Sequence, residues 1–392
     1  MQPTRAPLVA DDVGRPLRLA FLGDPNSIHI ARWAGFFASR GHEIHLLVPS
    51  TDTISTPVDS RFHVHTFRAW PRLPIRGLGS LVTMLTLRRA LWSIRPDVLH
   101  AHFLTRYGWA ARLSGFRPYV ITVWGSDVFV TPRSSPHARL WAGRTLSNAA
   151  LVTAVSADLA RAAVELGAAP ERIKIVQFGV DPQEFKPGTA SDALRSRLGL
   201  EGRRVVFSPR ALRPIYRHEV AVRATALLPD DVTLLLVDWQ PNAEYRAELV
   251  RLIDELELGG RVRFVPPVPH EDLADYYHLS DVVVSLPTTD AFSVTALEAM
   301  ACGTPLVMGE LPSAHEGLDG VDAGAIVAGD DPIAVAAAIR TRLEFAPSDR
   351  SALGERLRAR AIERGDMRRN LLEMEGLYRG LAADRRPGVR TK

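Results

Sequence analysis

The chain has 392 residues, more than the size at which a single hydrophobic core keeps growing, so two domains of similar size are expected. Its composition, 46% hydrophobic and 23% charged, is typical of a folded globular protein, and no interleaved basic and aromatic run accompanies the net charge of +4, so no nucleic-acid partner is predicted. The single cysteine, Cys302, excludes an internal disulfide framework and a cysteine-based zinc site.

The first sixteen residues lack the apolar core of a signal peptide. No later segment reaches the roughly 18 consecutive apolar residues of a membrane span. We therefore predict a disordered tail over residues 1–16 and a cytoplasmic protein.

From Leu17 onward, short apolar runs alternate with helical patterns. Expected strands cover residues 17–23, 42–49, 96–102, 119–124 and 151–156, and expected helices cover 28–41, 105–115 and 134–149. This alternation predicts a doubly wound parallel sheet in a first domain, residues 17–187.

A second series of the same kind follows a stretch containing Pro and Gly, residues 186–203. Its expected strands cover residues 204–210, 232–238, 261–267, 281–287 and 305–309, and its expected helices cover 219–228, 243–258, 270–280 and 294–303. The fold class is therefore α/β, with two Rossmann-like domains and a second domain over residues 188–365. Because open parallel sheets bind ligands outside the carboxyl ends of their strands, two facing sheets predict an interdomain cleft.

The segment PTTDAFSVTALEAMACGTPLV, residues 287–307, carries the most chemical information. Ser293 is a suitable N-cap for the helix that follows, and Gly303 is a suitable stop. The helix N-terminus would face the cleft, where free backbone N–H groups favour a diphosphate. Asp290 lies just before this helix and Glu298 lies within it.

This segment resembles the retaining glycosyltransferases of family four, which carry an acidic residue, seven intervening positions, a glutamate and then Ala-Met-Ala-Cys-Gly-Thr-Pro. The resemblance implies that Glu298 binds the donor ribose and that Asp290, a catalytic residue, meets the sugar and phosphates together with the following residues, Ala291, Phe292 and Ser293. Asp290 stands where Glu is usual and Ala291 where Gly is usual. The alternative is that both acids only decorate a solvent-facing helix end.

Arg210 directly follows an expected strand, where a guanidinium can bind phosphate oxygens with two parallel hydrogen bonds. Family members have an arginine here and, about one and a half turns later, a lysine, and both contact the donor diphosphate. Tyr216 stands near the lysine position with Arg217 beside it. We predict Arg210 as a catalytic residue and Arg217 as a donor contact, with a solvated surface arginine as the alternative for Arg217.

In the first domain, Gly23 and Asp24 follow the first strand, and His100 and His102 share one face of a later strand. No third ligand accompanies the two histidines, so a buried, satisfied pair competes with a metal site, and we predict no metal. The resemblance places Gly23 at the donor and Asp24 near the sugar or acceptor.

The turn Trp-Gly-Ser-Asp, residues 124–127, resembles a His-x-Gly-x-Asp-like turn that the family places near the donor sugar. Trp124 replaces the histidine, so the role of that histidine is either absent or supplied by His102, which we therefore predict as catalytic. The predicted sugar or acceptor contacts in this turn are Trp124, Gly125, Ser126 and Asp127. Phe178 likewise stands where the family has asparagine.

The resemblance extends from about Leu17 to about Leu381, and it implies that the first domain binds the acceptor and that a terminal helix over residues 366–385 crosses back to it. The expected activity is sugar transfer, with retention of configuration, from a UDP- or GDP-sugar to an unidentified acceptor, without a cofactor. Departing diphosphate would be stabilised by Arg210 and the helix N-terminus before Val294. A nucleotide-sugar 2-epimerase and a non-catalytic nucleotide-sugar-binding protein are the alternatives, whereas the loop GDPNSIH disfavours a dehydrogenase.

Arginines flank an apolar helical stretch over residues 72–96. A basic amphipathic helix can lie on an anionic membrane, so peripheral contact with the inner membrane face is a further hypothesis. The alternative is a helix that packs on its own sheet.

Overall fold

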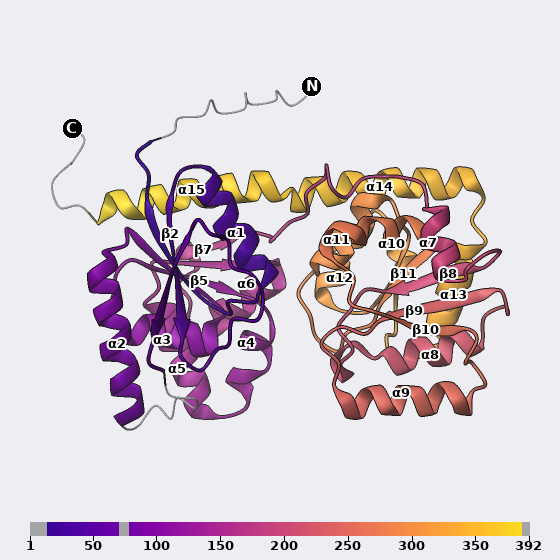
Figure 1. Cartoon of the computed structure of the whole chain (residues 1–392), viewed down its shortest axis with the longest axis horizontal. Coiled ribbons are helices and arrows are strands. Elements are labelled where there is room, and N and C mark those ends of the chain that lie inside the picture. Colours follow the sequence, from indigo (N-terminus) through magenta and orange to yellow (C-terminus); the bar gives the residue numbers. More distant parts are fainter. Residues whose placement is uncertain (1–13, 70–77, 386–392) are drawn as a thin grey trace.

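The computed structural model describes residues 14–69 and 78–385, and it contains two α/β units placed side by side (Figure 1). The first unit holds a seven-stranded sheet in the order β3-β2-β1-β4-β5-β6-β7, and the second holds a six-stranded sheet in the order β10-β9-β8-β11-β12-β13. The paired strands of both sheets run parallel, for example β1 with β4 and β8 with β11. The predicted pair of Rossmann-like domains is confirmed.

The first unit is built from the following elements. Its strands are β1 (Arg18–Leu22), β2 (Glu43–Pro49), β3 (Phe62–Phe67), β4 (Val98–His102), β5 (Tyr119–Val123), β6 (Leu151–Ala154) and β7 (Ile173–Ile175). Its helices and helical turns are α1 (Ile28–Ser39), α2 (Leu78–Ile94), η1 (Leu104–Gly108), α3 (Trp109–Leu113), α4 (Ser126–Phe129), η2 (Thr131–Arg133), α5 (Pro136–Ser147), α6 (Ala157–Glu165) and η3 (Pro170–Arg172).

The second unit repeats the alternation. Its strands are β8 (Arg204–Ser208), β9 (Val232–Val237), β10 (Val262–Val265), β11 (Val282–Ser285), β12 (Leu306–Gly309) and β13 (Ile326–Val327). Its helices and helical turns are α7 (Asp192–Arg197), η4 (Pro214–Tyr216), α8 (His218–Ala226), α9 (Ala243–Glu255), η5 (His270–Asp272), α10 (Leu273–Leu279), α11 (Val294–Cys302), α12 (Pro312–Leu318), η6 (Ala323–Ala325), α13 (Pro332–Leu343) and α14 (Pro347–Gly365).

The central strands are apolar because helices cover both faces of each sheet. Every residue of β4, β5, β9 and β11 is buried, as expected for strands inside a parallel sheet. The edge strand β3 reads FHVHTF and exposes His63 and Val64, so its sequence lacks the apolar run that predicts a buried strand. The sequence did not indicate this strand.

The chain crosses between the two units twice, and the crossings pair with each other. The amide of Val180 donates to the carbonyl of Gly365 at 2.7 Å, and the amide of Met367 donates to the carbonyl of Val180 at 3.0 Å. Gly179 has a φ of +81°, and a Cβ there would lie 2.6 Å from the Cα of Met367, so only glycine fits.

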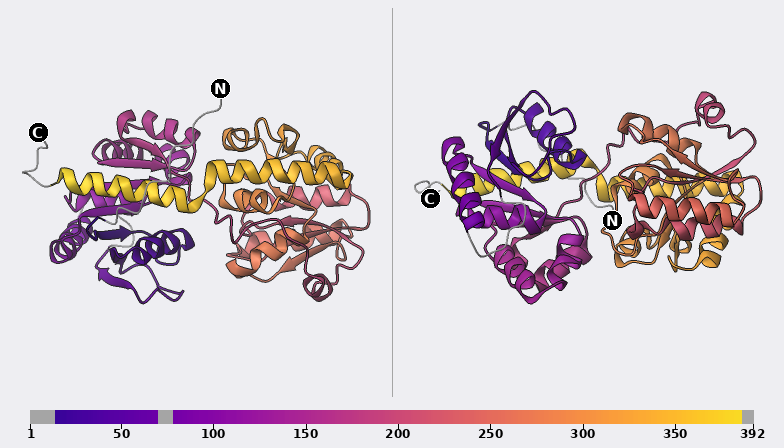
Figure 2. Two further views of the ribbon diagram at one scale, coloured as in Figure 1. Left: turned by 90° about the horizontal axis from the view of Figure 1, so that it is seen from above. Right: turned by 60° about the horizontal axis from the view of Figure 1, so that its bottom comes forward.

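The final helix, α15 (Met367–Asp384), returns along the first unit after α14 has run along the second (Figures 1 and 2). Its Tyr378 is fully buried and bonds His100, and its Glu375 accepts from Arg379 at 2.7 Å and contacts His42 at 3.2 Å. Of the expected N-terminal tail, residues 1–13 lie outside the described residues. In residues 14–69 and 78–385, no helix has the length and apolar character that crossing a membrane requires.

Candidate active site

The loop between β11 and α11 lies against the first unit. Ser293 caps α11, since its hydroxyl accepts from the amide of Ala296 at 3.3 Å, and left-handed Gly303 (φ +77°) ends the helix. On the first-unit side, Gln177 donates to the carbonyl of Phe292 at 3.2 Å. A Cβ at Gly125 would lie 3.9 Å from the amide nitrogen of Ala291. The N-terminus of α11 therefore opens at the junction of the two units.

Arg210 and Asp290 meet at this junction although 80 residues separate them. A guanidinium nitrogen of Arg210 donates to Asp290 at 2.6 Å, and a second donates to the hydroxyl of Thr295 at 3.1 Å. The guanidinium also lies over the Tyr216 ring, 4.2 Å from its centroid, and Arg210 is only 8% exposed. Burial raises the pKa of Asp290, while the Arg210 charge opposes the rise. Tyr216, near the position where lysine is usual in the family, thus helps to hold Arg210.

Glu298 lies in α11, whose residues from Ala296 to Cys302 are all buried. It is 3% exposed, and it accepts a hydrogen bond from the Tyr277 hydroxyl at 2.9 Å. Burial raises its pKa to about 7, against the opposing effects of Arg32 and the Tyr277 hydrogen bond. The alternative that Glu298 lies on a solvent-facing helix end without a function is wrong, because its side chain is buried.

Three charged or titratable side chains near Glu298 were not anticipated from the sequence. His270 Nδ1 lies 4.0 Å from Glu298, and His270 Nε2 lies 3.1 Å from Glu184. Arg32 of α1, in the first unit, lies 3.9 Å from Glu184. These residues come from α1, the connecting segment and η5, and no local motif marks them.

A carboxylate of the second unit also binds a helix of the first. Both oxygens of Glu316, on α12, accept from the amide of Ala157 at the start of α6, at 3.1 and 2.9 Å. Arg364 donates to the same carboxylate at 3.3 Å. This contact fixes the two units close together beside the α11 loop.

The first loop of the first unit is tightly packed. A Cβ at Gly23 would lie 2.3 Å from the Ile30 side chain and 3.2 Å from His102, so Gly23 permits α1 to approach β4. Asp24 is exposed, and its carboxylate accepts from the amide of Asn26 at 2.9 Å. Gly23 therefore shapes the loop, and Asp24 is accessible from solvent.

The turn over residues 124–127 has an inner and an outer side. Asp127 is fully buried and accepts from three backbone amides, those of Leu104, Trp124 and Gly125, at 2.7, 3.0 and 2.8 Å. Ser126 is exposed at the start of α4. The structure thus directs Asp127 into the protein, where it holds the turn, and leaves Trp124, Gly125 and Ser126 nearer the junction.

His102 lies inside the first unit. It is 1% exposed, its ring stacks on that of His100 with centroids 4.1 Å apart, and neither ring nitrogen has a hydrogen-bond partner in the described part of the chain. Burial lowers its pKa to about 3. His100 in turn bonds Thr122 at 2.6 Å. Across the described residues, no group of three or more His, Cys, Asp or Glu side chains could hold a metal ion.

Arg217 lies at the start of α8, where its side chain forms no cap hydrogen bond. It has left-handed φ and ψ angles of 49° and 46°, precedes α8, and is partly exposed. Its guanidinium would contact a Cβ at Gly329 at 3.4 Å, close to the end of β13. Among the described residues it forms no hydrogen bond or ion pair with Asp290 or Glu298, and its role as a donor contact stays a prediction.

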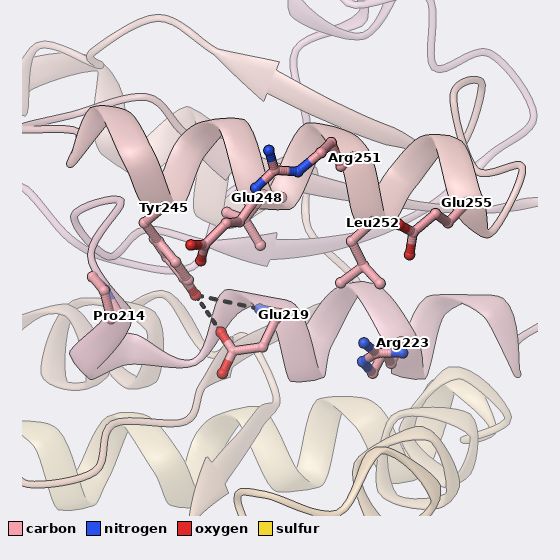
Figure 3. Close-up of a pocket in the computed structure, with 9 residues that line it drawn as sticks. Pro214, Glu219, Arg223, Tyr245, Glu248, Arg251, Leu252 and Glu255 are labelled. Carbon is pink, nitrogen blue, oxygen red and sulfur yellow. Dashed lines mark hydrogen bonds between the residues drawn. The ribbon is translucent and has the colours of Figure 1, made fainter.

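Two cavities flank these features. The larger, about 440 Å³, lies between α8 and α9, where Tyr245 bonds Glu219 and charges of both signs alternate (Figure 3). The smaller, about 280 Å³, lies at the carboxyl ends of β2 and β3 in the first unit. It is lined by Pro49, Thr51, Phe67, Ala69, Thr83, Thr105, Arg106, Tyr107, Trp109, Ala110 and Thr131. Only the smaller cavity lies at the sheet edge where parallel sheets bind ligands.

Two facing Rossmann-like units, with the partly buried Asp290, the buried Glu298 and a helix N-terminus at their junction, have the architecture of a GT-B glycosyltransferase. Comparison with known proteins agrees. Residues 18–156 match the family model described as glycosyl transferase 4-like, and residues 191–361 match that of glycosyl transferases group 1. The chain belongs to the family-four-like glycosyltransferases. The predicted family, fold and glycosyltransferase activity are confirmed, and the 2-epimerase alternative is not favoured.

Named relatives support the family assignment, and solved structures share the fold. The D-inositol 3-phosphate glycosyltransferases of Mycobacterium tuberculosis (strain H37Rv) and Mycobacterium bovis are 30% identical over 390 residues, covering 91% of this chain and 79% of theirs. The structure of Anabaena HepE in complex with UDP superposes with a TM-score of 0.78 at 21% identity, covering 93% of this chain and 100% of that one. Sucrose-phosphate synthase from Thermosynechococcus elongatus gives a TM-score of 0.79 at 23% identity, covering 94% and 100%.

Proposed function

We propose that this enzyme transfers a sugar from a UDP-sugar, with retention of configuration, to a small polyhydroxylated acceptor. The main observation that supports the donor site is the burial of Glu298. This residue lies eight positions after Asp290, on a helix whose N-terminus opens at the domain junction. Solved structures of HepE contain UDP, UDP with glucose, or UDP-glucose, which favours uridine over guanosine.

The proposed donor contacts follow from this geometry. The ribose hydroxyls donate to Glu298, and the diphosphate binds Arg210 and the amides of Ala291, Phe292 and Ser293 at the N-terminus of α11. Both contributions stabilise the negative charge that develops on the departing diphosphate. Asp290, held by Arg210, lies at the sugar end of this site, and its ion pair makes it a poor covalent nucleophile.

The smaller cavity of the first unit is the proposed acceptor site. Its volume of about 280 Å³ lies just below the usual range of small-molecule pockets, which suits an acceptor of monosaccharide size. Threonine hydroxyls line it, and Arg106 forms an ion pair with Asp52, which also accepts from the Tyr107 hydroxyl at 2.8 Å. Because the mycobacterial relatives are named for an inositol phosphate, the first acceptors to test are inositol phosphates, sugar phosphates and the free polyols.

A thermal-shift panel of UDP-, GDP-, ADP- and CMP-sugars tests the donor. A ligand at one hundred times its Kd stabilises the folded protein by about 2.7 kcal/mol, so the UDP-sugars should selectively raise Tm. Selective stabilisation by GDP-sugars instead would contradict the uridine assignment. UDP release that depends on acceptor distinguishes transfer from epimerisation, and the anomeric configuration of the product tests retention.

We further propose that α2 contacts anionic membranes. Leu87 and Leu91 pack into the core, while Leu81, Leu85 and Trp92 are 45%, 52% and 73% exposed and share one stripe with exposed arginines. Residues 72–77 of the predicted basic stretch lie outside the described residues. An amphipathic helix with aromatic and cationic side chains suits the headgroup region of a bilayer.

Flotation with vesicles tests this contact. Wild-type protein should float with vesicles containing an anionic lipid at low salt, and Trp92→Glu should remove most of the floating fraction, because it places a negative charge at an apolar position of α2 that is 73% exposed. Neutral phosphatidylcholine vesicles are the control. Wild-type protein that stays in the soluble fraction with anionic vesicles would contradict the proposal.

A further inference from the structure

His29, in the first turn of α1, lies between two aromatic residues at positions where the sequence departs from the family pattern. Its ring stacks on Phe178 with centroids 4.5 Å apart and planes 12° apart. The same ring meets Trp124 edge-on, with centroids 5.5 Å apart. The family has histidine at the position that Trp124 occupies in this chain. The imidazole of His29 therefore lies beside a position where the family has an imidazole.

Both aromatic partners of His29 adjoin residues that touch the α11 loop. Gln177, next to Phe178, donates to the carbonyl of Phe292, and Gly125, next to Trp124, approaches the amide of Ala291. α1 also lies on the side of the first unit that faces the second (Figure 1). His29 therefore lies on the first-unit side of the proposed diphosphate site.

The environment of His29 keeps its ring uncharged at neutral pH. Burial lowers its pKa to about 4, and the positive charges of Arg32 and Arg210 add to this effect. A neutral imidazole has one donor and one acceptor nitrogen, and His29 forms no hydrogen bond within the described part of the chain. Such a group suits an uncharged hydroxyl better than a phosphate, and it is a weak general base.

His102 contrasts with His29. It is sealed inside the first unit among Phe21, Trp33 and His100. Its ring contacts Trp124 only edge-on, with centroids 6.2 Å apart. Of the two histidines, only His29 bridges Trp124 and Phe178.

We propose that the imidazole of His29 hydrogen-bonds a hydroxyl of the transferred sugar and offers it an acceptor nitrogen, which the Trp124 indole, a donor only, lacks. This role rests on the proposed function, because it requires a nucleotide sugar in the adjoining site. It assigns His29, rather than His102, to the sugar.

Calorimetric titration with UDP and with a UDP-sugar isolates this contact, because only the second ligand carries the sugar. The probe is whichever of UDP-glucose, UDP-galactose and UDP-N-acetylglucosamine stabilises the wild type most. His29→Ala should weaken the UDP-sugar about 2- to 12-fold, the worth of one neutral hydrogen bond, and leave the affinity for UDP unchanged. Equal losses for both ligands, or no loss for either, would overturn the assignment.

Two further variants separate hydrogen bonding from packing. His29→Phe keeps an aromatic ring against Phe178 and Trp124 but should lose the sugar contact as His29→Ala does; a wild-type affinity for the UDP-sugar would overturn the proposal. Adding Trp124→His to His29→Ala should restore part of the affinity for the sugar, and a folded double variant with no recovery would contradict a shared subsite. His63→Ala, an exposed histidine on β3, is the matched control.

Different results would contradict the proposed function and the proposed role of His29. If the wild type binds neither UDP nor any UDP-sugar, the donor assignment is wrong. If the wild type binds both and the His29 variants bind them equally well, the donor assignment stands and the role of His29 is wrong.

Discussion

Replacing Arg210 by alanine should lower donor affinity and turnover by roughly ten- to a hundredfold, since a lost charge-assisted hydrogen bond is worth about 1.5–3 kcal/mol. The structure adds a second effect, because Arg210 also pairs with the partly buried Asp290 at 2.6 Å. Removing the guanidinium leaves that carboxylate without its partner, which also costs stability. The measurement is kcat/KM for the donor, with Tm recorded for each variant.

Two companion variants distinguish the direct effect from the loss of Asp290's partner. Arg210→Lys keeps the charge but loses the planar fork, so it should remain impaired while folding better than Arg210→Ala. The double variant Arg210→Ala with Asp290→Asn removes the unpaired charge and should recover stability without recovering activity. A folded Arg210→Ala protein with wild-type donor affinity and turnover would remove Arg210 from the site.

Replacing Glu298 by alanine should weaken binding of free UDP as strongly as binding of a UDP-sugar, because the ribose belongs to both ligands. Glu298 is buried and already accepts from Tyr277, so its carboxylate is fixed before the ligand arrives. Loss of charge-assisted bonds should cost on the order of tenfold or more in Kd. Glu298→Gln keeps the shape but removes the charge and should lie between the wild type and the alanine variant.

Calorimetric titration of UDP decides the role of Glu298. Equal affinities of the wild type and Glu298→Ala would refute the ribose contact and with it the main support for the donor site. Glu373→Ala, which changes an exposed glutamate of α15, is the matched control and should leave both Kd and Tm near the wild-type values.

The pKa of Glu298 adds a pH signature. Burial raises that pKa to about 7 from a usual value of 4.5, so the free enzyme loses the carboxylate as pH falls through 7, and UDP affinity should fall with it. Folding stability should move the other way. Because the folded pKa lies above the unfolded pKa, the contribution of Glu298 to stability is complete below about pH 4.5 and is lost as pH rises through 7. Glu298→Gln should remove both dependences.

The packing of the first unit shows where sequence patterns failed. The strand periodicity correctly placed His100 and His102 on one face, as their stacked rings show. It did not reveal that this face is covered by α1 and by Tyr378 of α15, because a period of two says nothing about which elements pack against a strand. The edge strand β3 was missed for a related reason, since His63 and His65 interrupt the apolar pattern.

The sequence by itself determined the features that local chemistry encodes. The alternation of apolar runs and helical patterns predicted both parallel sheets, and Ser293 and Gly303 marked the two ends of α11 as the structure has them. The spacing of Asp290 and Glu298, with the run that follows, indicated the family. The caps and the spacing each lie within a short segment, where neighbouring residues are in contact because they are close in the chain.

Only the tertiary structure decided which distant residues share the site. Arg210 reaches Asp290 across 80 residues, and Tyr277 reaches Glu298 from another helix. His29 and Phe178 lie near opposite ends of the first unit's sequence, yet their rings stack. The elevated pKa of Glu298 and the lowered pKa of His29 depend on burial, which arises when helices pack and water is excluded. Neither periodicity nor helix caps predict these contacts, because they form only when separate elements pack together.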